Sequence, residues 1–343
     1  MHRRPNATVM HDVVIVGAGP VGLACAIEAS RAGLTPLVIE KDTLVNSIVG
    51  YPARMEFFST PELIEIGGYP FPVQGYKPTR EEAIEYYRGV AAREQLDIRL
   101  YERVLEVQGT VGDFTVVTDK ARHPARHVIV SIGFFDQPNL LNVPGENLPK
   151  VTHYYREPYA YVRQRVAIVG ARNSAAKAAL DCYRHGAEVT LIVRAPELSD
   201  KVKYWIRPDL ENRIAEGSIR ACFNTVVEEI RESSIVLRTP EGVTEVGNDW
   251  VLAMTGYRPD YGFLEKLKIA IADDPSRTPV YDDATFETSR PGVYLAGTVC
   301  GGLRTGRWFI ENGRFHASQI VKHITVGRAD PVPFDAIHWK TEE

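Results

Sequence analysis

A glycine-rich segment near the N-terminus restricts the possible folds of this chain more than any other feature. A β-branched run at residues 13–16 is followed by Gly17, Gly19 and Gly22, then by an alanine-rich stretch and a second apolar run that ends at Glu40. The order of buried strand, turn, helix and strand predicts a βαβ unit. The first glycine makes the turn, the second lets a pyrophosphate approach the backbone, and the third lets the helix pack closely. We therefore expect a dinucleotide site here.

The same pattern occurs a second time. The run Val-Ala-Ile-Val ending at Val169 and the turn at Gly170 repeat the opening strand and turn at a constant offset of 153 residues. The identical pairs are Val13/Val166, Gly17/Gly170, Arg31/Arg184 and Gly33/Gly186. A constant offset through strand, turn, helix and helix end is hard to obtain by chance, so we expect two dinucleotide domains.

The two motifs differ where their second strands end. Glu40 can accept hydrogen bonds from an unphosphorylated ribose, such as that of the FAD adenosine. Arg194, with Lys201 and Lys203 close behind, would attract the 2′-phosphate of NADPH; the alternative is that Arg194 only ends a solvated strand. Arg172 replaces the central glycine of the second motif, which hinders close backbone approach but offers a guanidinium to the pyrophosphate.

The length and charge of the chain agree with a two-domain enzyme. One hydrophobic core rarely supports 343 residues. The 40 Lys and Arg residues against 44 Asp and Glu residues give a net charge of −4 without a dense basic run, so neither nucleic acid nor a membrane is an expected partner. No apolar segment has the length of a membrane span, and we expect a cytoplasmic protein. Residues 1–10 are expected to be a flexible extension, with Met10 as an alternative start.

The cysteines do not form a recognisable redox or metal motif. Cys25, Cys182, Cys222 and Cys300 are scattered, with no Cys-x-x-Cys pair. Neither a disulfide framework nor a metal site is therefore expected. Cys25 and Cys182 fall in alanine-rich helical stretches and are expected to be small buried hydrophobes.

The second motif is expected to be inserted into the first domain. A buried strand that ends at Gly133 is similar in sequence to the strand that ends at Gly256. These two strands mark where the chain leaves the first domain and where it re-enters it. The expected fold is α/β, with two Rossmann-like domains. The expected boundaries are residues 11–145 and 255–330 for the FAD domain, 146–254 for the NADPH domain, 1–10 for the extension and 331–343 for a C-terminal tail.

Three further segments carry local predictions. Thr79 and Glu82 form a capping box that opens a helix over residues 79–94. An apolar stripe predicts one continuous helix from about residue 305 to 323. The aromatic and polar insert at residues 46–60 fits either a loop against a flat ring system or an ordinary surface loop.

The order of these motifs resembles the thioredoxin-reductase-like flavoproteins. The shared segments are the first glycine motif, Val143-Pro-Gly145-Glu146, the second glycine motif, Thr255-Gly256-x-x-Pro259-Asp260 and Gly292-Val-Tyr-x-Ala296-Gly297. The resemblance implies FAD in the discontinuous domain, NADPH in the inserted one, and a homodimer. The redox Cys-x-x-Cys of thioredoxin reductases is missing, since residues 147–165 contain no cysteine.

A narrower resemblance is to the bacilliredoxin reductases, also called bacillithiol-disulfide reductases. It rests on Asn46-Ser-Ile, Tyr51-Pro, Phe57-Phe-Ser-Thr60, His153-Tyr-Tyr, Asn173-Ser174, Lys203-x-Trp205-Ile and Ile310-Glu-Asn-Gly-Arg-Phe-His316. A basic residue at Arg172 looks typical of this family, as does the loss of the usual Asp at Thr298. Val21 stands where relatives often carry a cysteine, so a mechanism that uses a thiol at that position is excluded for this chain.

The motifs and the resemblance together nominate the cofactor-binding residues. The residues expected to bind FAD are Gly17, Gly19, Pro20, Gly22, Glu40, Lys41, Asn46, Ser47, Gly133, Gly297, Thr298 and Ile310. The residues expected to bind NADPH are Gly170, Arg172, Asn173, Ser174, Ala175, Arg194, Lys201, Lys203, Thr255 and Gly256.

The resemblance implies an FAD-dependent reductase that oxidises NADPH and passes electrons to a disulfide of a bacilliredoxin or of a low-molecular-weight thiol, such as bacillithiol disulfide. Cys300 and His153 are the two candidate catalytic residues, and a structural role is the alternative for each. Three other functions stay open: a flavin monooxygenase, a ferredoxin-NADP reductase of the thioredoxin-reductase type, and a flavin-loaded redox sensor without turnover.

Overall fold

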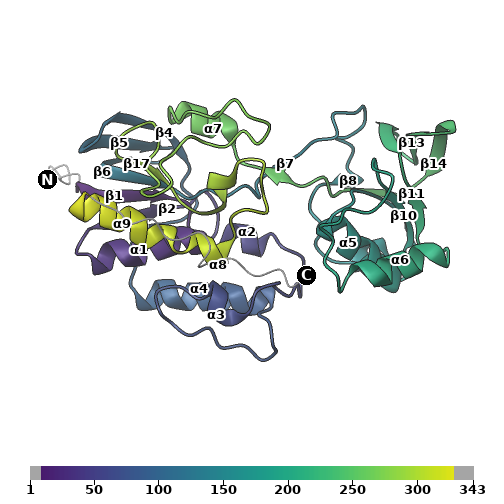
Figure 1. Cartoon of the computed structure of the whole chain (residues 1–343), viewed down its shortest axis with the longest axis horizontal. Coiled ribbons are helices and arrows are strands. Elements are labelled where there is room, and N and C mark those ends of the chain that lie inside the picture. Colours follow the sequence, from purple (N-terminus) through teal and green to yellow (C-terminus); the bar gives the residue numbers. More distant parts are fainter. Residues whose placement is uncertain (1–8, 328–343) are drawn as a thin grey trace, which may run out of the picture. The chain divides into compact units, whose positions relative to one another are not determined.

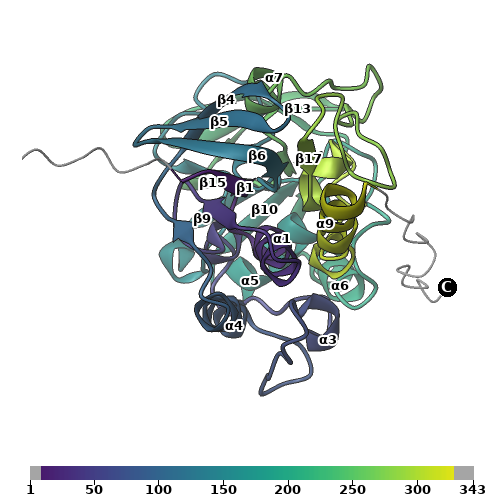
Figure 2. The same ribbon diagram turned by 90° about the vertical axis from the view of Figure 1, so that its left-hand side faces the viewer.

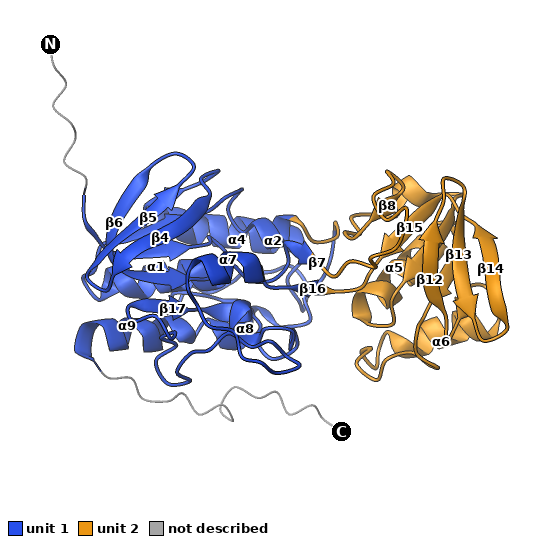
Figure 3. Ribbon diagram, turned by 90° about the horizontal axis from the view of Figure 1, so that it is seen from above, with its two compact units in different colours: residues 1–49, 54–137, 257–343 blue, residues 50–53, 138–256 orange. Residues whose placement is uncertain are grey.

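The computed structural model describes residues 9–327, which divide into two compact units (Figure 3). Unit 1 comprises residues 1–49, 54–137 and 257–343, and unit 2 comprises residues 50–53 and 138–256. Residues 1–8 of the expected extension and the expected tail at 331–343 lie outside the described residues.

Unit 1 is built on a mixed sheet with the order β3-β2-β1-β6-β5-β4, in which β17 also pairs with β6 (Figure 1). The strands are β1 (His11–Val16), β2 (Pro36–Ile39), β3 (Ile98–Arg99), β4 (Val104–Thr110), β5 (Asp113–Thr118), β6 (Arg122–Val130) and β17 (Val293–Leu295). Strands β3, β2, β1, β6 and β17 run parallel, whereas β4 and β5 form an antiparallel hairpin beside β6. The βαβ unit predicted from residues 13–40 is confirmed.

The helices of unit 1 cover this sheet, and α1 lies beside α9 in two perpendicular views (Figures 1 and 2). They are α1 (Pro20–Arg31), α2 (Asn46–Val49), α3 (Pro61–Ile64), α4 (Arg80–Arg93), α7 (Tyr261–Lys266), α8 (Ile310–Gly313) and α9 (His316–Val326), with a 3₁₀ turn, η2, at Gly297–Gly301. The predicted capping box is confirmed, since the Thr79 hydroxyl accepts from the Glu82 N–H and the Glu82 carboxylate accepts from the Thr79 N–H.

The prediction of one continuous helix over residues 305–323 is wrong. The Asn312 side chain accepts a hydrogen bond from the Phe309 N–H (2.7 Å) and donates one to the Arg307 carbonyl (3.0 Å), so it fixes the start of α8 at Ile310. The helix is then interrupted after Gly313, where Arg314 donates to the carbonyl of Glu65. Contacts to other segments therefore override the apolar periodicity.

Unit 2 contains a five-stranded parallel sheet of order β11-β10-β9-β15-β8 and an antiparallel sheet of order β12-β13-β14. The strands are β8 (Val151–Thr152), β9 (Arg165–Val169), β10 (Glu188–Ile192), β11 (Arg220–Cys222), β12 (Val226–Ile230), β13 (Ser234–Thr239), β14 (Gly242–Gly247) and β15 (Trp250–Ala253). The helices are α5 (Asn173–Arg184) and α6 (Arg207–Ala215), with a 3₁₀ turn, η1, at Tyr159–Tyr161. Alanines of α5 pack on β9 and β10 and form the main core of this unit.

The boundary between the units lies earlier in the chain than the expected one at residue 145. The Pro-Gly segment packs against β12, because the Ile230 N–H donates to the carbonyl of Pro144 (2.9 Å). A Cβ added at Gly145 would lie 1.8 Å from the Ile230 carbonyl oxygen. This segment therefore belongs to unit 2.

The return of the chain also differs from the expected boundary at residue 255. The Asn139 N–H donates to the Gly256 carbonyl (2.9 Å), and the Thr255 hydroxyl donates to the Asn139 carbonyl (2.5 Å). These bonds join the two connecting segments to each other, and residues 138–145 and 255–256 both belong to unit 2. The strands β7 (Gln137–Pro138) and β16 (Tyr257–Arg258) pair where the chain passes between the units.

We expect alanine at Gly145 to destabilise the protein far more than alanine at Gly186. Both glycines have a left-handed φ (82° and 84°), but a Cβ at Gly186 meets nothing within 4 Å. Gly186→Ala should cost about 1 kcal/mol of conformational strain. Gly145→Ala should cost more than about 3 kcal/mol, since β12 must move away. Denaturant unfolding of the two variants measures the difference, and equal losses would contradict the packing described for Gly145.

Candidate functional site

The first glycine turn joins the ends of β1 and β6 to the start of α1. Gly17 has a φ of 108°, and a Cβ there would lie 2.7 Å from the Ser131 carbonyl oxygen. A Cβ at Gly22 would lie 2.1 Å from the Gly17 carbonyl oxygen and 2.6 Å from the Ser131 hydroxyl. Around Gly19, by contrast, no atom beyond its immediate chain neighbours lies within 4 Å of an added Cβ. The turn is closed on the protein side and open where a pyrophosphate would approach.

Glu40 is fixed beside this turn. Its Oε2 accepts the Ala18 N–H (2.9 Å) and its Oε1 accepts the Asp42 N–H (3.0 Å). Burial raises the pKa of this carboxyl group above its ordinary value. Each carboxylate oxygen keeps capacity for a further hydrogen bond, so the group fits a ribose diol.

An ionic cluster that the sequence did not reveal lies next to Glu40. The Lys41 Nζ atom is 2.5 Å from Asp42 Oδ2 and 3.1 Å from Asp136 Oδ2. The Asn46 side chain donates to Asp42 Oδ2 (3.1 Å), and the Val45 N–H donates to the Ala18 carbonyl (3.1 Å). These bonds hold the start of α2, which also carries Ser47, against the glycine turn.

The remaining residues expected to bind FAD lie at the carboxyl end of the same sheet. A Cβ at Gly133 would lie 3.4 Å from the Thr298 hydroxyl oxygen, which places the turns after β6 and β17 side by side. A Cβ at Gly297 would lie 3.2 Å from the Val21 side chain, and one at Gly313 would lie 3.2 Å from the Gly297 Cα. Three segments are thus in contact: the first turn of α1, the turn that follows β17, and the helix α8, which begins at Ile310.

The second glycine turn, in unit 2, repeats this construction. The Gly170 N–H donates to the Ile192 carbonyl (3.0 Å), as the Gly17 N–H donates to the Ile39 carbonyl (2.8 Å). Gly170 has a φ of 144°, and a Cβ there would lie 2.5 Å from the Met254 carbonyl oxygen. It would also lie 3.1 Å from the Cβ of Ala175, so the position needs small neighbours.

The basic residues of unit 2 lie around the start of α5. Arg172 is the exposed N-cap residue of α5, and Ser174 is exposed in its first turn. Arg194 is exposed two residues after the end of β10, and the segment that carries Lys201 and Lys203 returns to Asn173. Thr255 and Gly256 bond to Asn139 and thereby join the two connecting segments of the chain.

The cysteines are not placed for thiolate chemistry. Cys25, Cys182 and Cys300 are buried, and burial raises the pKa of all three thiols, for Cys25 and Cys182 to about 12. Cys222 is partly buried in β11 of unit 2. The structure therefore favours the structural role that was the alternative for Cys300.

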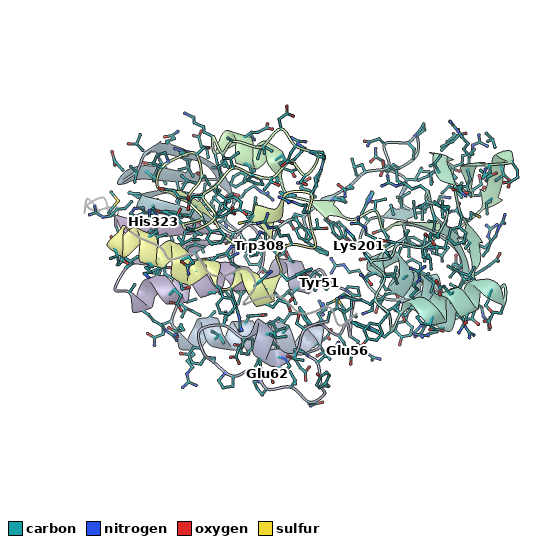
Figure 4. The ribbon with its side chains drawn as sticks, in the orientation of Figure 1. Tyr51, Glu56, Glu62, Lys201, Trp308 and His323 are labelled. Carbon is teal, nitrogen blue, oxygen red and sulfur yellow. The ribbon has the colours of Figure 1, made fainter. Side chains whose placement is uncertain are left out.

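The two histidines near these segments are held by structural contacts. His153 lies in unit 2 with 14% of its side chain exposed, and its Nε2 is 3.3 Å from Glu146 Oε1. Buried His316 accepts the Gly297 N–H at Nδ1 (3.1 Å) and lies 3.9 Å from the Cys300 sulfur. Its ring stacks on Phe286, and it lies edge-on to Trp308, which is labelled in Figure 4.

Comparison with known proteins decides the family. Residues 14–297 match the model of the pyridine nucleotide-disulphide oxidoreductases. The chain is 40% identical to bacilliredoxin reductase Bdr of Bacillus subtilis over 318 residues, which cover 92% of this chain and 98% of that protein. This chain belongs to the bacilliredoxin reductase family.

Solved structures of this family have the same fold. The bacillithiol disulfide reductase Bdr of Bacillus cereus gives a TM-score of 0.91 at 38% identity and covers 93% of this chain and 100% of its own. That of Staphylococcus aureus gives a TM-score of 0.90 at 37% identity and covers 93% and 99%. The expected fold class, two Rossmann-like domains of the thioredoxin-reductase type, is therefore confirmed, and the protein is an oxidoreductase.

The described part of the chain contains neither a cluster of metal-binding side chains nor a membrane-spanning helix. Among residues 9–327, no group of three or more His, Cys, Asp and Glu side chains could hold a metal ion. Within the same residues, no helix has the length and apolar character of a membrane span.

We expect His316→Gln to reduce the acid sensitivity of the protein. Burial lowers the pKa of His316 from 6.5 to about 3, so the unfolded chain takes up a proton below pH 6.5 that the folded chain does not. The wild type should therefore lose about 2 kcal/mol more of its unfolding free energy than the variant between pH 7 and pH 5. Denaturant titrations at both pH values measure this difference.

His316→Phe supplies the second variant of that experiment. It removes the acceptor for the Gly297 N–H and should be less stable at both pH values. It should nevertheless show the same weak pH dependence as His316→Gln. An unchanged pH dependence in both variants would contradict a neutral, buried His316.

Proposed function

We propose that this protein is an FAD-dependent NADPH oxidoreductase that reduces a disulfide of a bacilliredoxin or of a low-molecular-weight thiol, with bacillithiol disulfide as the leading candidate. The observation that carries the proposal is the 40% identity to a bacilliredoxin reductase over 98% of that protein's length. The resemblance also supports a cytoplasmic homodimer. The lower similarity to other flavoproteins leaves the monooxygenase and the ferredoxin-NADP reductase as outcomes to be tested.

The construction of unit 1 supports its assignment to FAD. The open space at Gly19 lets a pyrophosphate approach, and the fixed Glu40 carboxylate suits the adenosine ribose. Lys41, Asn46 and the turns at Gly133 and Gly297 surround the same end of the sheet. Pro20 at the start of α1, Gly17, Gly22, Ser47, Thr298 and Ile310 complete the proposed FAD-binding set.

The charges of unit 2 support its assignment to NADPH. The first turn of α5 contains no acidic residue, and Arg172 lies directly before it. Arg194 is exposed one residue beyond Val193, the counterpart of Glu40 in unit 1, so it places positive charge near the adenosine ribose and favours a 2′-phosphate. Gly170, Asn173, Ser174, Ala175, Lys201, Lys203, Thr255 and Gly256 complete the proposed NADPH-binding set.

The protein supplies binding and orientation, while the cofactors supply the redox chemistry. A flavin held by unit 1 would supply the redox chemistry, namely acceptance of a hydride from the reduced nicotinamide and transfer of two electrons to a disulfide. The glycine turns align the two nucleotides through their pyrophosphates, and the ionic groups Glu40 and Arg194 select the ribose that each unit binds. No side chain of this chain needs to donate a proton for the hydride step.

The test of the function is anaerobic oxidation of NADPH by the purified flavoprotein, with bacilliredoxin and bacillithiol disulfide offered as acceptors. Turnover that depends on the disulfide is the expected result. A parallel run in air separates the alternatives, since a flavin that ignores disulfides but forms a long-lived oxygen adduct would indicate a monooxygenase. Rapid reduction of ferredoxin without disulfide activity would indicate a ferredoxin-NADP reductase.

We expect Arg194→Ala to remove the preference for NADPH over NADH. Loss of a charged hydrogen bond to the 2′-phosphate should raise the KM for NADPH about 10-fold or more and leave the KM for NADH unchanged. Arg220→Ala, which removes an exposed arginine at the start of β11, is the matched control. Equal effects of Arg194→Ala on both nucleotides would contradict a 2′-phosphate contact.

We expect a cysteine-free variant, with Cys25, Cys182, Cys222 and Cys300 replaced by alanine or serine, to keep its disulfide reductase activity. Three of these thiols are buried, so the acceptor disulfide cannot reach them. Reduction of the flavin in the wild type should take about one equivalent of NADPH, since no second redox couple is present. Uptake of about two equivalents, or a mixed disulfide found by mass spectrometry, would contradict this expectation.

A further inference from the structure

A segment of unit 2 between β10 and α6 is tied to the second glycine turn through one side chain. Asn173, the first residue of α5, donates from Nδ2 to the Lys201 carbonyl (3.0 Å) and accepts the Lys203 N–H at Oδ1 (3.0 Å). The Ser199 N–H also donates to the Ala171 carbonyl (3.1 Å). We call residues 199–206 the return segment. Lys201 accordingly lies beside α5 in the common view of Figures 1 and 4.

The return segment has two side chains buried in the core of unit 2 and two large aromatic side chains exposed to solvent. Val202 and Ile206 are buried in the core of unit 2. Tyr204 and Trp205 are 81% and 45% exposed, which is unusual for adjacent large aromatic residues. The anchors and the Asn173 bonds fix the backbone, so these exposed rings are not at the end of a loose loop.

The ring of Trp205 is oriented before any ligand binds. The Lys203 Nζ atom lies 5.6 Å from its centroid, and the Tyr204 ring packs edge-on at 4.8 Å with an interplanar angle of 90°. A cation and an aromatic edge thus hold one indole ring on a segment whose backbone is bonded to the first residue of α5. An ordered, half-exposed indole with nearby ammonium groups has the chemistry that binds an adenine base next to phosphates.

We infer that the return segment recognises the adenosine 2′-phosphate half of the pyridine nucleotide, with Trp205 as the stacking surface for adenine and Asn173 as the positioning residue. Lys201 and Lys203 place positive charge next to the phosphates. The inference rests on the proposed function and extends it, because it assigns the adenine contact to a residue outside both glycine motifs. Removal of Trp205 should weaken adenine binding without changing the redox chemistry.

The binding test uses adenosine 2′,5′-bisphosphate and the full-length flavoprotein in calorimetric titrations. Trp205→Ala should weaken binding about 10-fold, and Trp205→Phe should retain most of the affinity. In steady-state assays the KM for NADPH of Trp205→Ala should rise about 10-fold while kcat is unchanged. Tyr159→Ala, which removes a 59% exposed tyrosine from the same unit, is the matched control and should change neither value.

The possible results separate this inference from the proposed function. If Trp205→Ala binds the bisphosphate with unchanged affinity, the inference is overturned. Disulfide-dependent NADPH oxidation by the same variant would still support the proposed function. A raised KM for bacilliredoxin alone would also overturn it, since Trp205 would then contact the protein acceptor. A wild type that neither binds nor oxidises NADPH would refute the proposed function itself.

The role of Asn173 has a test that does not depend on turnover. Asn173→Ala removes both bonds to the return segment, so trypsin should cut after Lys201 and Lys203 several-fold faster than in the wild type. Adenosine 2′,5′-bisphosphate should protect these sites in the wild type and less in the variant. Cleavage after exposed Lys120 in unit 1 is the internal control. Equal cleavage rates and equal protection in both proteins would overturn the positioning role.

Discussion

The close approach of a glycine turn to the end of a parallel strand is the constraint on which both units depend. Around Gly17 and Gly22, backbone atoms and the Ser131 hydroxyl occupy the space that side chains would need. The Ser131 hydroxyl donates to the carbonyls of Val16 and Gly17 (both 3.0 Å), so the ends of β1 and β6 are fixed together. A helix that begins this close to the sheet directs its free N–H groups at one point, which suits a pyrophosphate.

The second unit keeps the turn and changes its surroundings. Gly170 packs on the Met254 carbonyl as Gly17 packs on Ser131, but Ala175 and Arg172 stand where the first turn has glycines. The first unit places the buried carboxylate of Glu40 directly after its second strand, whereas the second has buried Val193 there, followed by the exposed Arg194. The two units thus share one backbone construction, and we propose that the different charge after the second strand suits each unit to a different nucleotide.

The buried side chains near Gly297 are not placed for redox or proton-transfer chemistry. Cys300 is buried with a raised thiol pKa, and neutral His316 accepts a backbone N–H instead of a proton from substrate. Val21 fills the space beside Gly297 and Gly313. Within residues 9–327 these buried groups are therefore structural, which agrees with our proposal that a flavin held by unit 1 carries the redox chemistry.

The sequence alone determined the two dinucleotide units, their insertion and the family, because glycine spacing, strand periodicity and the ionic residue after each second strand are local features that the chemistry of the ligand imposes. The capping box at Thr79 was predictable for the same reason. Only the tertiary structure decided where the chain passes from one unit to the other, since residues 138–145 belong to unit 2 through contacts with residues such as Ile230, over 80 residues away. It also decided that the last helix is interrupted at Arg314 and that Asn173 bonds to the return segment. These features depend on side chains that find partners distant in the sequence, and no periodicity records such partners.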